Sequence, residues 1–373
     1  MVKNTYEELG NRAPVPCSIE EADGVAWAMT EPGTAMTQLP FKHPPLLENE
    51  VRIKVTHAGL CHSDVFVATC GWHDNVAFPC VPGHEIVGIV EKVGDRVTEF
   101  KQGERVGFGV FRDCCENCAG CEQCRVGKDN CCPELQLTYD PHFGGYATSF
   151  QGKAKYFFHM PENVPGEAAP LFCAGLTTYA PLKRNVLPGM KVAVIGIGGL
   201  GHLAIQFANK MGCEVTAIST SPSKEEEARS FGAHHFLNSK DPEQVKNAMG
   251  TFDFLINTST KIDLTADAVL LKKRGVYNVV GIPGKENDFN FNLMPFLFNH
   301  IEFKPSLVGS RVECVEMLEF CCLHNIFPKT EVYPFAEAQK AMNSLADGNP
   351  HYPNYRAVLE TESFFKTFTP ASN

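Results

Sequence analysis

Residues 191–201 read Lys191-Val192-Ala193-Val194-Ile195-Gly196-Ile197-Gly198-Gly199-Leu200-Gly201, and this stretch decides the fold of the 373-residue chain. Its first half is apolar enough to predict a buried strand. Its glycines, spaced Gly-x-Gly-x-x-Gly, predict a tight turn into a helix that begins at His202. A second apolar run at 214–218 follows at the distance expected of the next parallel strand. This order of elements predicts an α/β fold with a doubly wound parallel sheet.

The glycine-rich turn also predicts a dinucleotide site of the Rossmann type. Glycine lets the backbone approach a pyrophosphate, and the first amide groups of the following helix are donors at the positive end of its dipole. Strand-like runs at 252–256 and 275–280 alternate with helical segments and continue the same sheet. The candidate pyrophosphate-binding residues are Gly196, Gly198, Gly199, Leu200 and Gly201.

The residues after the second strand predict which dinucleotide is bound. An acidic side chain there would hydrogen-bond the ribose 2′-hydroxyl of NAD(H) and repel the 2′-phosphate of NADP(H). This chain instead has hydroxyl groups and a lysine, which suit a phosphate. We therefore expect NADP(H), bound by Ser219, Thr220, Ser221 and Lys224. The alternative is that residues 221–223 only cap a helix predicted at 224–228.

Two other segments and a distant cysteine carry metal-binding side chains. Segment 59–64 contributes Cys61, and segment 82–85 contributes His84 and Glu85. Cys173 lies in an apolar segment rich in small residues, which indicates a buried position. Cysteine sulfur, histidine nitrogen and sometimes carboxylate oxygen are the ligands that zinc takes in a tetrahedral shell. Three protein ligands leave a fourth position open, which is the pattern of a catalytic zinc.

Cysteines also cluster between residues 113 and 133. Their C-x2-C-x2-C spacing, closed by one further cysteine, predicts a structural zinc bound by four thiolates. The candidate ligands are Cys118, Cys121, Cys124 and Cys132. The choice of four stays open, because Cys115 is also spaced for binding and Cys131 adjoins Cys132. An iron–sulfur loop is disfavoured because nothing else in the sequence indicates electron transfer.

Short alternating runs around the ligand segments predict β-strands at 24–29, 50–55, 86–93 and 107–110. Glycines separate them, as in small β-barrels with sharp corners. A helix is predicted at 335–342 and a closing strand at 356–360, which would rejoin the first domain. We therefore expect a discontinuous zinc-binding catalytic domain, residues 1–178 and 318–373, with a dinucleotide-binding domain of residues 179–317 inserted in it.

The composition is that of a soluble globular chain, with 44% hydrophobic and 20% charged residues. The net charge of -10 and the lack of a lysine- and arginine-rich run argue against nucleic acid as a partner. The first residues do not have the pattern of a signal or transit peptide, and no apolar run is long enough for a membrane span. We expect a cytoplasmic protein that does not bind membranes.

Taken together, these segments resemble the zinc-containing medium-chain dehydrogenase superfamily, and within it the cinnamyl alcohol dehydrogenase-like family. The matching segments, in order and spacing, are 59–64, 82–88, the cysteine-rich loop, 169–175, 196–201 and 219–224. The resemblance implies a groEL-like β-barrel catalytic domain around the Rossmann domain, a catalytic and a structural zinc in each subunit, and a homodimer. It also implies that Glu85 is an alternative fourth ligand of the catalytic zinc.

The resemblance further implies an NADP-dependent alcohol dehydrogenase or aldehyde reductase, which interconverts primary alcohols and aldehydes, aromatic or medium aliphatic, by hydride transfer. Ser63 would exchange a proton with the substrate oxygen, His62 would face the cofactor pyrophosphate, and Asp64 would orient the His84 imidazole. A polyol dehydrogenase that uses NAD(H) is the alternative, although such enzymes usually have an acidic residue after the second strand. A non-catalytic binding protein of this superfamily would be expected to lose the metal ligands, which this chain retains.

One position departs from the family pattern. Phe66 occupies the place where a histidine commonly ends the proton relay. The proton would then leave through His62 or through water at the cofactor ribose, and we expect a pH–rate profile with a flatter acid limb. The candidate walls of the substrate pocket are Trp72, Phe78, Phe111 and Phe298, although each of them could equally be a core residue.

Overall fold

A computed structural model describes residues 13–72, 76–115, 121–139, 143–282, 291–345 and 355–367, with side chains described as far as residue 364. The chain divides into two compact units, Met1–Cys173 with Lys329–Asn373, and Ala174–Pro328. The second unit interrupts the first in sequence. The expected boundaries at 178/179 and 317/318 fall inside helices α4 (Ala174–Asn185) and α10 (Arg311–His324), both of which lie wholly in the second unit.

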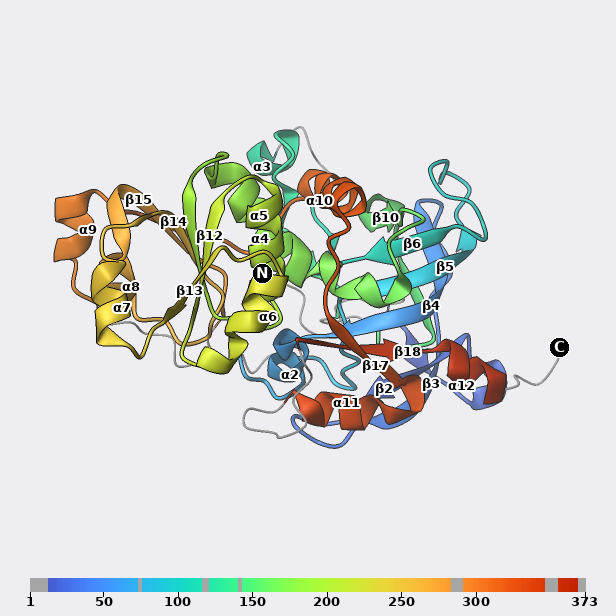
Figure 1. Ribbon diagram of the computed structural model, residues 1–373. Helices are drawn as coiled ribbons and strands as arrows, with labels where there is room; N and C mark the ends of the chain where they lie inside the picture. The colour runs from blue at the N-terminus through green and yellow to red at the C-terminus, as the bar shows by residue number, and fades with distance from the viewer. Residues whose placement is uncertain are drawn as a thin grey trace. The chain divides into compact units, whose positions relative to one another are not determined.

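The second unit contains a six-stranded sheet with the order β13-β12-β11-β14-β15-β16, in which all neighbouring strands are parallel (Figure 1). Its strands are β11 (Lys191–Ile195), β12 (Glu214–Ser219), β13 (His235–Asn238), β14 (Phe252–Asn257), β15 (Leu271–Val279) and β16 (Glu302–Pro305). Its helices besides α4 and α10 are α5 (Gly201–Lys210), η6 (Pro222–Lys224), α6 (Glu225–Ser230), α7 (Pro242–Asn247), α8 (Leu264–Ala268) and α9 (Met294–Asn299). The predicted doubly wound Rossmann sheet is confirmed.

The glycine-rich turn joins β11 to α5 as the sequence predicts. Val192, Ala193 and Val194 are fully buried, because a parallel strand is covered on both faces. Gly201, the first residue of α5, packs against the backbone of the turn. A Cβ atom there would lie 1.8 Å from the carbonyl oxygen of Gly196, so only glycine allows the helix to begin so close to the strand.

The first unit is mainly β. Its largest sheet has seven strands in the order β10-β6-β5-β4-β18-β17, with β9 also paired to β4. These strands are β4 (Glu50–Leu60), β5 (Ile86–Val93), β6 (Arg105–Phe108), β9 (Ser149–Lys153), β10 (Phe157–His159), β17 (Thr330–Pro334) and β18 (Arg356–Glu360). Figure 1 shows the C-terminal strand β18 beside β4, and the two pair antiparallel. The closing strand therefore rejoins the first unit, as predicted.

Smaller elements complete the first unit. They are β1 (Val15–Pro16), η2 (Ile19–Glu21), β2 (Gly24–Ala28), β3 (Thr37–Lys42), α2 (His62–Ala68), β7 (Phe111–Asp113), α3 (Glu122–Arg125), η3 (Asp129–Cys131), β8 (Gln136–Leu137), η4 (Ala154–Tyr156), η5 (Gly166–Phe172), η7 (Phe335–Glu337), α11 (Ala338–Ser344) and α12 (Glu362–Thr367). The predicted helix at 335–342 is divided between η7 and α11. The strand predicted at 107–110 is shifted, because β6 ends at Phe108.

None of the helices in the described part of the chain combines the length and the hydropathy needed to cross a membrane.

Candidate active site

Four predicted metal ligands meet in the first unit. One ligand atom from each of Cys61, His84, Glu85 and Cys173 lies within 4.8 Å of the other three. Cys61 follows the last residue of β4, His84 and Glu85 directly precede β5, and Cys173 follows η5. His84 and Glu85 are fully buried, and both cysteines are at least nine-tenths buried. Residues far apart in sequence therefore form one compact, buried cluster.

The pairing of two strands brings three of these ligands together. β4 and β5 are antiparallel, with Ala58 opposite Ile86, and the Gly59 amide donates to the Glu85 carbonyl oxygen at 2.8 Å. A Cβ atom on Gly59 would lie 2.0 Å from Glu85 Oε2. Glycine is thus required at position 59 so that the Glu85 side chain can lie over the strand.

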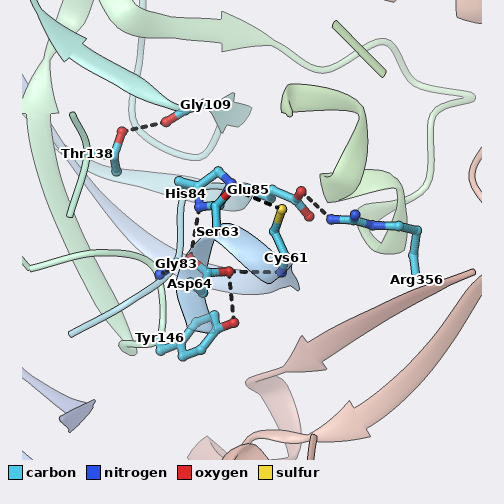
Figure 2. A network of polar contacts seen from close by, with 10 residues as sticks. All are labelled: Cys61, Ser63, Asp64, Gly83, His84, Glu85, Gly109, Thr138, Tyr146 and Arg356. Carbon is cyan, nitrogen blue, oxygen red and sulfur yellow. Dashed lines mark hydrogen bonds and ion pairs between the residues drawn. The ribbon is translucent and has the colours of Figure 1, made fainter. Parts of the chain in front are cut away.

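The carboxylate of Asp64 contacts both ligand segments through hydrogen bonds (Figure 2). Asp64 Oδ1 accepts from the Gly83 amide at 2.9 Å and lies 2.8 Å from His84 Nδ1. Asp64 Oδ2 accepts from the Cys61 amide at 2.9 Å and from the Tyr146 hydroxyl at 3.0 Å. With Nδ1 donating to Asp64, the other ring nitrogen of His84 presents its lone pair. Asp64 therefore fixes two ligand segments at once.

The ionisation of the cluster follows from its burial and from its partners. Burial opposes protonation of His84, but the Asp64 carboxylate and Cys61 outweigh it and raise the pKa of the imidazole. A hydrogen bond from Cys173 lowers the pKa of Cys61 well below that of a free thiol, although burial acts in the other direction. The same hydrogen bond, and then burial, raise the pKa of Cys173. One thiolate is therefore already favoured at this site.

Glu85 is paired with an arginine from the C-terminal strand. The Arg356 guanidinium donates to Glu85 Oε1, and both side chains are almost completely buried. Burial raises the pKa of Glu85, and the arginine opposes that rise. Arg356 was not a sequence candidate. An isolated arginine in an apolar strand could have indicated a buried ion pair. Its partner could not be predicted, because the contact depends on the pairing of β18 with β4.

The donor set fits zinc. Two cysteine sulfurs, one imidazole and one carboxylate are its preferred ligand types. His84 Nε2 and Glu85 Oε2 are buried and have no hydrogen-bond partner among the described residues, which is costly unless another group binds them. A metal ion at the centre of the four residues would satisfy both atoms.

The remaining predicted catalytic residues begin helix α2. Ser63 Oγ lies 3.5 Å from Cys61 Sγ, so the hydroxyl is close to the ligand cluster. His62 is the first residue of α2 and is half-buried. Phe66 stacks on Trp72, with ring centroids 5.4 Å apart. The position of the missing relay histidine is thus occupied by a phenylalanine that stacks on a tryptophan.

Aromatic side chains gather beside His84. Tyr139, which the sequence reading did not select, has its ring centroid 5.1 Å from that of His84 and is buried. It belongs to an apolar cluster with Val67 and Cys80, against which Trp72 and Phe78 pack. Of the other two predicted wall residues, Phe111 is buried on β7, whereas Phe298 lies on α9 in the second unit with 71% of its surface exposed.

The cysteine-rich loop also brings thiols together, and three of the four predicted ligands, Cys121, Cys124 and Cys132, are among them. Ligand atoms of Cys115, Cys121, Cys124 and Cys132 lie within 4.8 Å of one another. Cys118 lies outside the described residues. Cys115, which the spacing had left as an alternative, therefore lies at ligand distance from the three described members of the predicted set.

The candidate cofactor residues lie at the carboxyl ends of β11 and β12. Lys224 Nζ donates to the Ile197 carbonyl oxygen of the glycine-rich turn at 2.7 Å. The Ser219 hydroxyl accepts from the Ser221 amide at 3.1 Å, and Thr220 and Ser221 are exposed. The Ser221 side chain makes no capping hydrogen bond to η6, so the capping alternative has no support in this conformation.

Comparison with known proteins places the chain in a family. Residues 47–162 match the model of the alcohol dehydrogenase GroES-like domain, and residues 199–322 match that of the zinc-binding dehydrogenases. A probable mannitol dehydrogenase from Mesembryanthemum crystallinum is 36% identical over 370 residues, which cover 96% of this chain and 99% of that protein. The chain belongs to the zinc-containing medium-chain alcohol dehydrogenases, in the cinnamyl alcohol dehydrogenase-like family. The catalytic domain expected as groEL-like is thus a GroES-like domain.

Solved structures agree with this assignment. A cinnamyl alcohol dehydrogenase from Sorghum bicolor has a TM-score of 0.84 and 34% identity, with coverage of 90% of this chain and 97% of that one. An enzyme from Helicobacter pylori described as a cinnamyl alcohol dehydrogenase in complex with NADP(H) has a TM-score of 0.82 and 32% identity, with the same coverage. This alcohol dehydrogenase is therefore an oxidoreductase that acts on CH–OH groups with zinc and a nicotinamide dinucleotide.

Proposed function

We propose that this alcohol dehydrogenase reduces aldehydes and oxidises primary alcohols with NADP(H), at a catalytic zinc site formed by Cys61, His84 and Cys173. The observation that carries the proposal is the buried meeting of these three side chains, with the His84 imidazole oriented by Asp64. When bound, zinc would polarise the carbonyl group of the substrate toward hydride attack. The cysteine-rich loop would hold the structural zinc. Its ligands would be Cys118, Cys121, Cys124 and Cys132, or the set in which Cys115 replaces Cys118.

The side chains at the start of α2 would handle the substrate proton. The hydroxyl of Ser63 can both donate and accept, and its position beside Cys61 suits a hydrogen bond to the substrate oxygen. His62, the neighbouring residue, would contact the cofactor pyrophosphate and pass the proton to solvent. Phe66 cannot take part in that transfer, so the relay would be shorter than in relatives with a histidine at this position.

Glu85 would be an alternative fourth ligand. Its Oε2 atom is buried and has no hydrogen-bond partner among the described residues, while Arg356 binds its other oxygen. The arginine would hold the carboxylate back when a substrate or water takes the open position. Its positive charge would also offset the negative charge of the two thiolates.

NADP(H) is favoured over NAD(H) by the residues after β12. Ser219, Thr220 and Ser221 supply hydroxyl groups. Lys224 has three N–H donors, so it can bind a 2′-phosphate and keep its bond to Ile197. The glycine-rich turn, Gly196 to Gly201, would bind the pyrophosphate. The Helicobacter pylori relative in complex with NADP(H) supports the same choice.

The aromatic side chains beside His84 favour an aromatic or medium aliphatic substrate. Tyr139, Trp72 and Phe78 would form an apolar wall on which a phenyl ring could pack. A polyol is the second candidate, because relatives of similar identity are named probable mannitol dehydrogenases. A polyol would need more hydrogen-bonding partners than these aromatic rings provide.

We further propose a cytoplasmic homodimer. Within the described part of the chain no two cysteines are joined by a disulfide, as expected in a reducing compartment. β16 pairs on one side only within the described sheet, and Leu297, Phe298 and Phe303 near it are about half exposed or more. A second copy of the chain would cover these side chains. Sedimentation velocity tests this state, and a monomer or tetramer at micromolar concentration would contradict it.

The function is tested by following the oxidation of NADPH and of NADH with cinnamaldehyde and with hexanal. In the reverse direction, cinnamyl alcohol and mannitol are tested with each oxidised cofactor. We expect NADPH with cinnamaldehyde to have the highest kcat/KM. A preference for NADH would refute the role of Ser219 to Lys224. Faster turnover of mannitol than of cinnamyl alcohol would favour the polyol candidate.

A further inference from the structure

Three polar side chains meet in the second unit where β14 ends. Asp267 on α8 accepts, through Oδ2, from the Tyr277 hydroxyl at 2.6 Å and from the Asn257 side-chain amide at 3.0 Å. Asn257, the last residue of β14, and Tyr277 on β15 are fully buried, whereas Asp267 is half-buried. Tyr277 also packs in an apolar cluster with Leu255 and Leu264. A carboxylate in such surroundings is costly unless hydrogen bonds compensate it, so these contacts fix how the three side chains are oriented.

Asn257 connects this network to the glycine-rich turn. Its Oδ1 atom accepts from the Ser259 amide at 2.9 Å, which closes a tight turn over residues 257–259. Within that turn, the Thr258 hydroxyl donates to two carbonyl oxygens where β11 passes into the glycine-rich turn, at 2.9 and 3.1 Å. A Cβ atom on Gly196 would lie 3.0 Å from the same hydroxyl oxygen. The 257–259 turn therefore packs directly on the first residue of the glycine-rich turn.

We propose that Asp267 is a positioning residue for the dinucleotide site, because its carboxylate orients Asn257 and thereby holds the 257–259 turn against the glycine-rich turn. The inference rests on the proposed role of Gly196 to Gly201 in binding the pyrophosphate. Asp267 acts through Asn257 and is therefore not a catalytic residue.

The ionised carboxylate sets the orientation of Asn257. An aspartate can only accept hydrogen bonds, so it faces Asn257 Nδ2 and leaves Oδ1 for the Ser259 amide. A protonated Asp267 would carry its own O–H group, which could donate to Oδ1 of a rotated Asn257 side chain. The rotated side chain would then present Nδ2 to the Ser259 amide. Two donors would face each other, and the turn would open.

The surroundings of Asp267 bring its protonation into an accessible pH range. Burial raises the pKa of Asp267 to about 6, although the hydrogen bonds from Tyr277 and Asn257 act in the other direction. The charge of Asp263, at the N-terminus of α8, raises this pKa further. Tyr277 remains a donor, because burial raises the pKa of its hydroxyl. The orienting carboxylate is therefore present above about pH 6 and is lost as the pH falls below it.

The other elements packed around α8 add little charge near Asp267. Helix α9, whose Phe296 belongs to the same apolar cluster, has no titratable side chain. On β15, Lys272 is paired with Asp253 of β14 at 2.9 Å, and the two basic residues that follow Lys272 are exposed. Asp263 is therefore the charged neighbour that a test must control.

Calorimetric titration of the whole zinc-loaded enzyme with NADP⁺ between pH 5 and 8 tests the proposal in the wild type, D267N and D263N. Asparagine at position 267 keeps the shape of the side chain but is neutral at every pH. D263N makes the same exchange at the exposed start of the same helix, where asparagine still caps it.

We expect D267N to have a Kd for NADP⁺ roughly fivefold higher than the wild type at pH 8, as for the net loss of one hydrogen bond. The two Kd values should converge at pH 5, where Asp267 is protonated in the wild type. D263N should match the wild type at pH 8. The ligand phosphate also titrates in this range, but it does so with every variant, so the ratio of the Kd values reports Asp267.

Hydrogen exchange in the enzyme without cofactor gives a second readout. The Ser259 amide should exchange faster in D267N than in the wild type or D263N at pH 8. In the wild type, its protection relative to a free amide should fall as the pH drops through about 6. This last measurement needs no variant, so it tests the proposal even if D267N fails to fold.

Tyr277→Phe separates positioning from general stability. It removes a hydrogen bond to the same oxygen of Asp267 but leaves a carboxylate facing Asn257. We expect its affinity for NADP⁺ to decline with falling pH as in the wild type, but from a higher pH, because the bond from Tyr277 lowers the pKa of Asp267. A purely structural role would give a loss of affinity that does not depend on pH.

Equal affinities of D267N and the wild type from pH 5 to 8, with equal exchange at Ser259, would overturn this inference alone. A Kd ratio that stays at its pH 8 value down to pH 5 would also overturn it, because the ionised carboxylate would then not be what orients Asn257. A wild-type enzyme that binds neither NADP⁺ nor NAD⁺ would overturn the proposed function and this inference with it.

Discussion

At the scale of single residues, Asp64 determines the geometry of the active site. One carboxylate accepts from two backbone amides, a tyrosine hydroxyl and the ligand imidazole. The sequence predicted its contact with His84, because an acidic residue near a ligand commonly orients a histidine. It could not predict Tyr146, since nothing local links a tyrosine so far along the chain to the turn at Cys61.

Asp64→Asn should weaken zinc binding at the catalytic site. The amide nitrogen of asparagine would face a donor, so His84 and Cys61 would lose their fixed orientation. We expect zinc affinity to fall roughly 10–100-fold, as for other residues that orient a metal-bound histidine. Competition with a chromophoric chelator measures the change. Tyr146→Phe, which removes one of the four donors, is the matched control, and an equal loss in both variants would contradict the leading role of Asp64.

At the scale of elements, most predicted strands and helices are present, and the differences lie at their ends. The strand predicted at 50–55 continues as β4 to Leu60, because the residues up to Ala58 pair with β5 and those near its end with β18. Long-range pairing of this kind does not appear in local alternation of polar and apolar residues. For the same reason, the Arg356–Glu85 ion pair could not be predicted.

Helix α2 carries the departure at Phe66, and Phe66→His tests its effect. Without a histidine, we expect the wild-type rate to vary only gradually with pH on the acid side. The variant should acquire a clear titration near neutrality, where an unperturbed imidazole ionises. The measurement is kcat/KM for cinnamaldehyde between pH 5 and 9. A single sharp titration near pH 7 in the wild type would contradict the expected flat acid limb.

Strand β3 leads into His43, which gives a second pH prediction, this time for stability. Burial, and then the charges of Arg52 and Arg112, lower the pKa of His43 to about 3. Its Nε2 atom lies 2.9 Å from Ser149 Oγ on β9. In the unfolded chain the His43 imidazole takes up a proton near pH 6.5, whereas in the folded chain it stays neutral at that pH. The contribution of the neutral imidazole to the free energy of unfolding is therefore fully present above pH 6.5 and is lost as the pH falls toward 3.

His43→Gln should remove this dependence. Between pH 6.5 and 4, the free energy of unfolding should fall less in the variant than in the wild type, by a difference on the order of 3 kcal/mol. Urea unfolding at several pH values measures the difference. Substitution of the exposed His159 is the control and should leave the pH dependence unchanged. Parallel curves for the wild type and His43→Gln would contradict burial of the neutral form.

At the scale of the whole molecule, the insertion of a Rossmann unit into a discontinuous β unit was predictable. The change from alternating to apolar strands and the return of a closing strand both appear in the sequence. The exact boundaries between the two units were not predictable. Helices α4 and α10 belong wholly to the second unit, whereas the change in the sequence pattern falls inside them. The second metal site was predictable in kind, whereas the sequence left the choice of ligands open, since regularly spaced cysteines offer several sets of four.

The most direct measurement compares zinc content and NADPH oxidation with cinnamaldehyde in Cys173→Ser and in the control Cys17→Ser. If zinc bound by Cys61, His84 and Cys173 carries the reaction, Cys173→Ser should lose the catalytic zinc and keep the structural zinc of the cysteine-rich loop. Its rate should be lower by about a hundredfold or more. Cys17→Ser should match the wild type in both respects. A Cys173→Ser enzyme with a full zinc content and a wild-type rate would contradict the assignment of the active site.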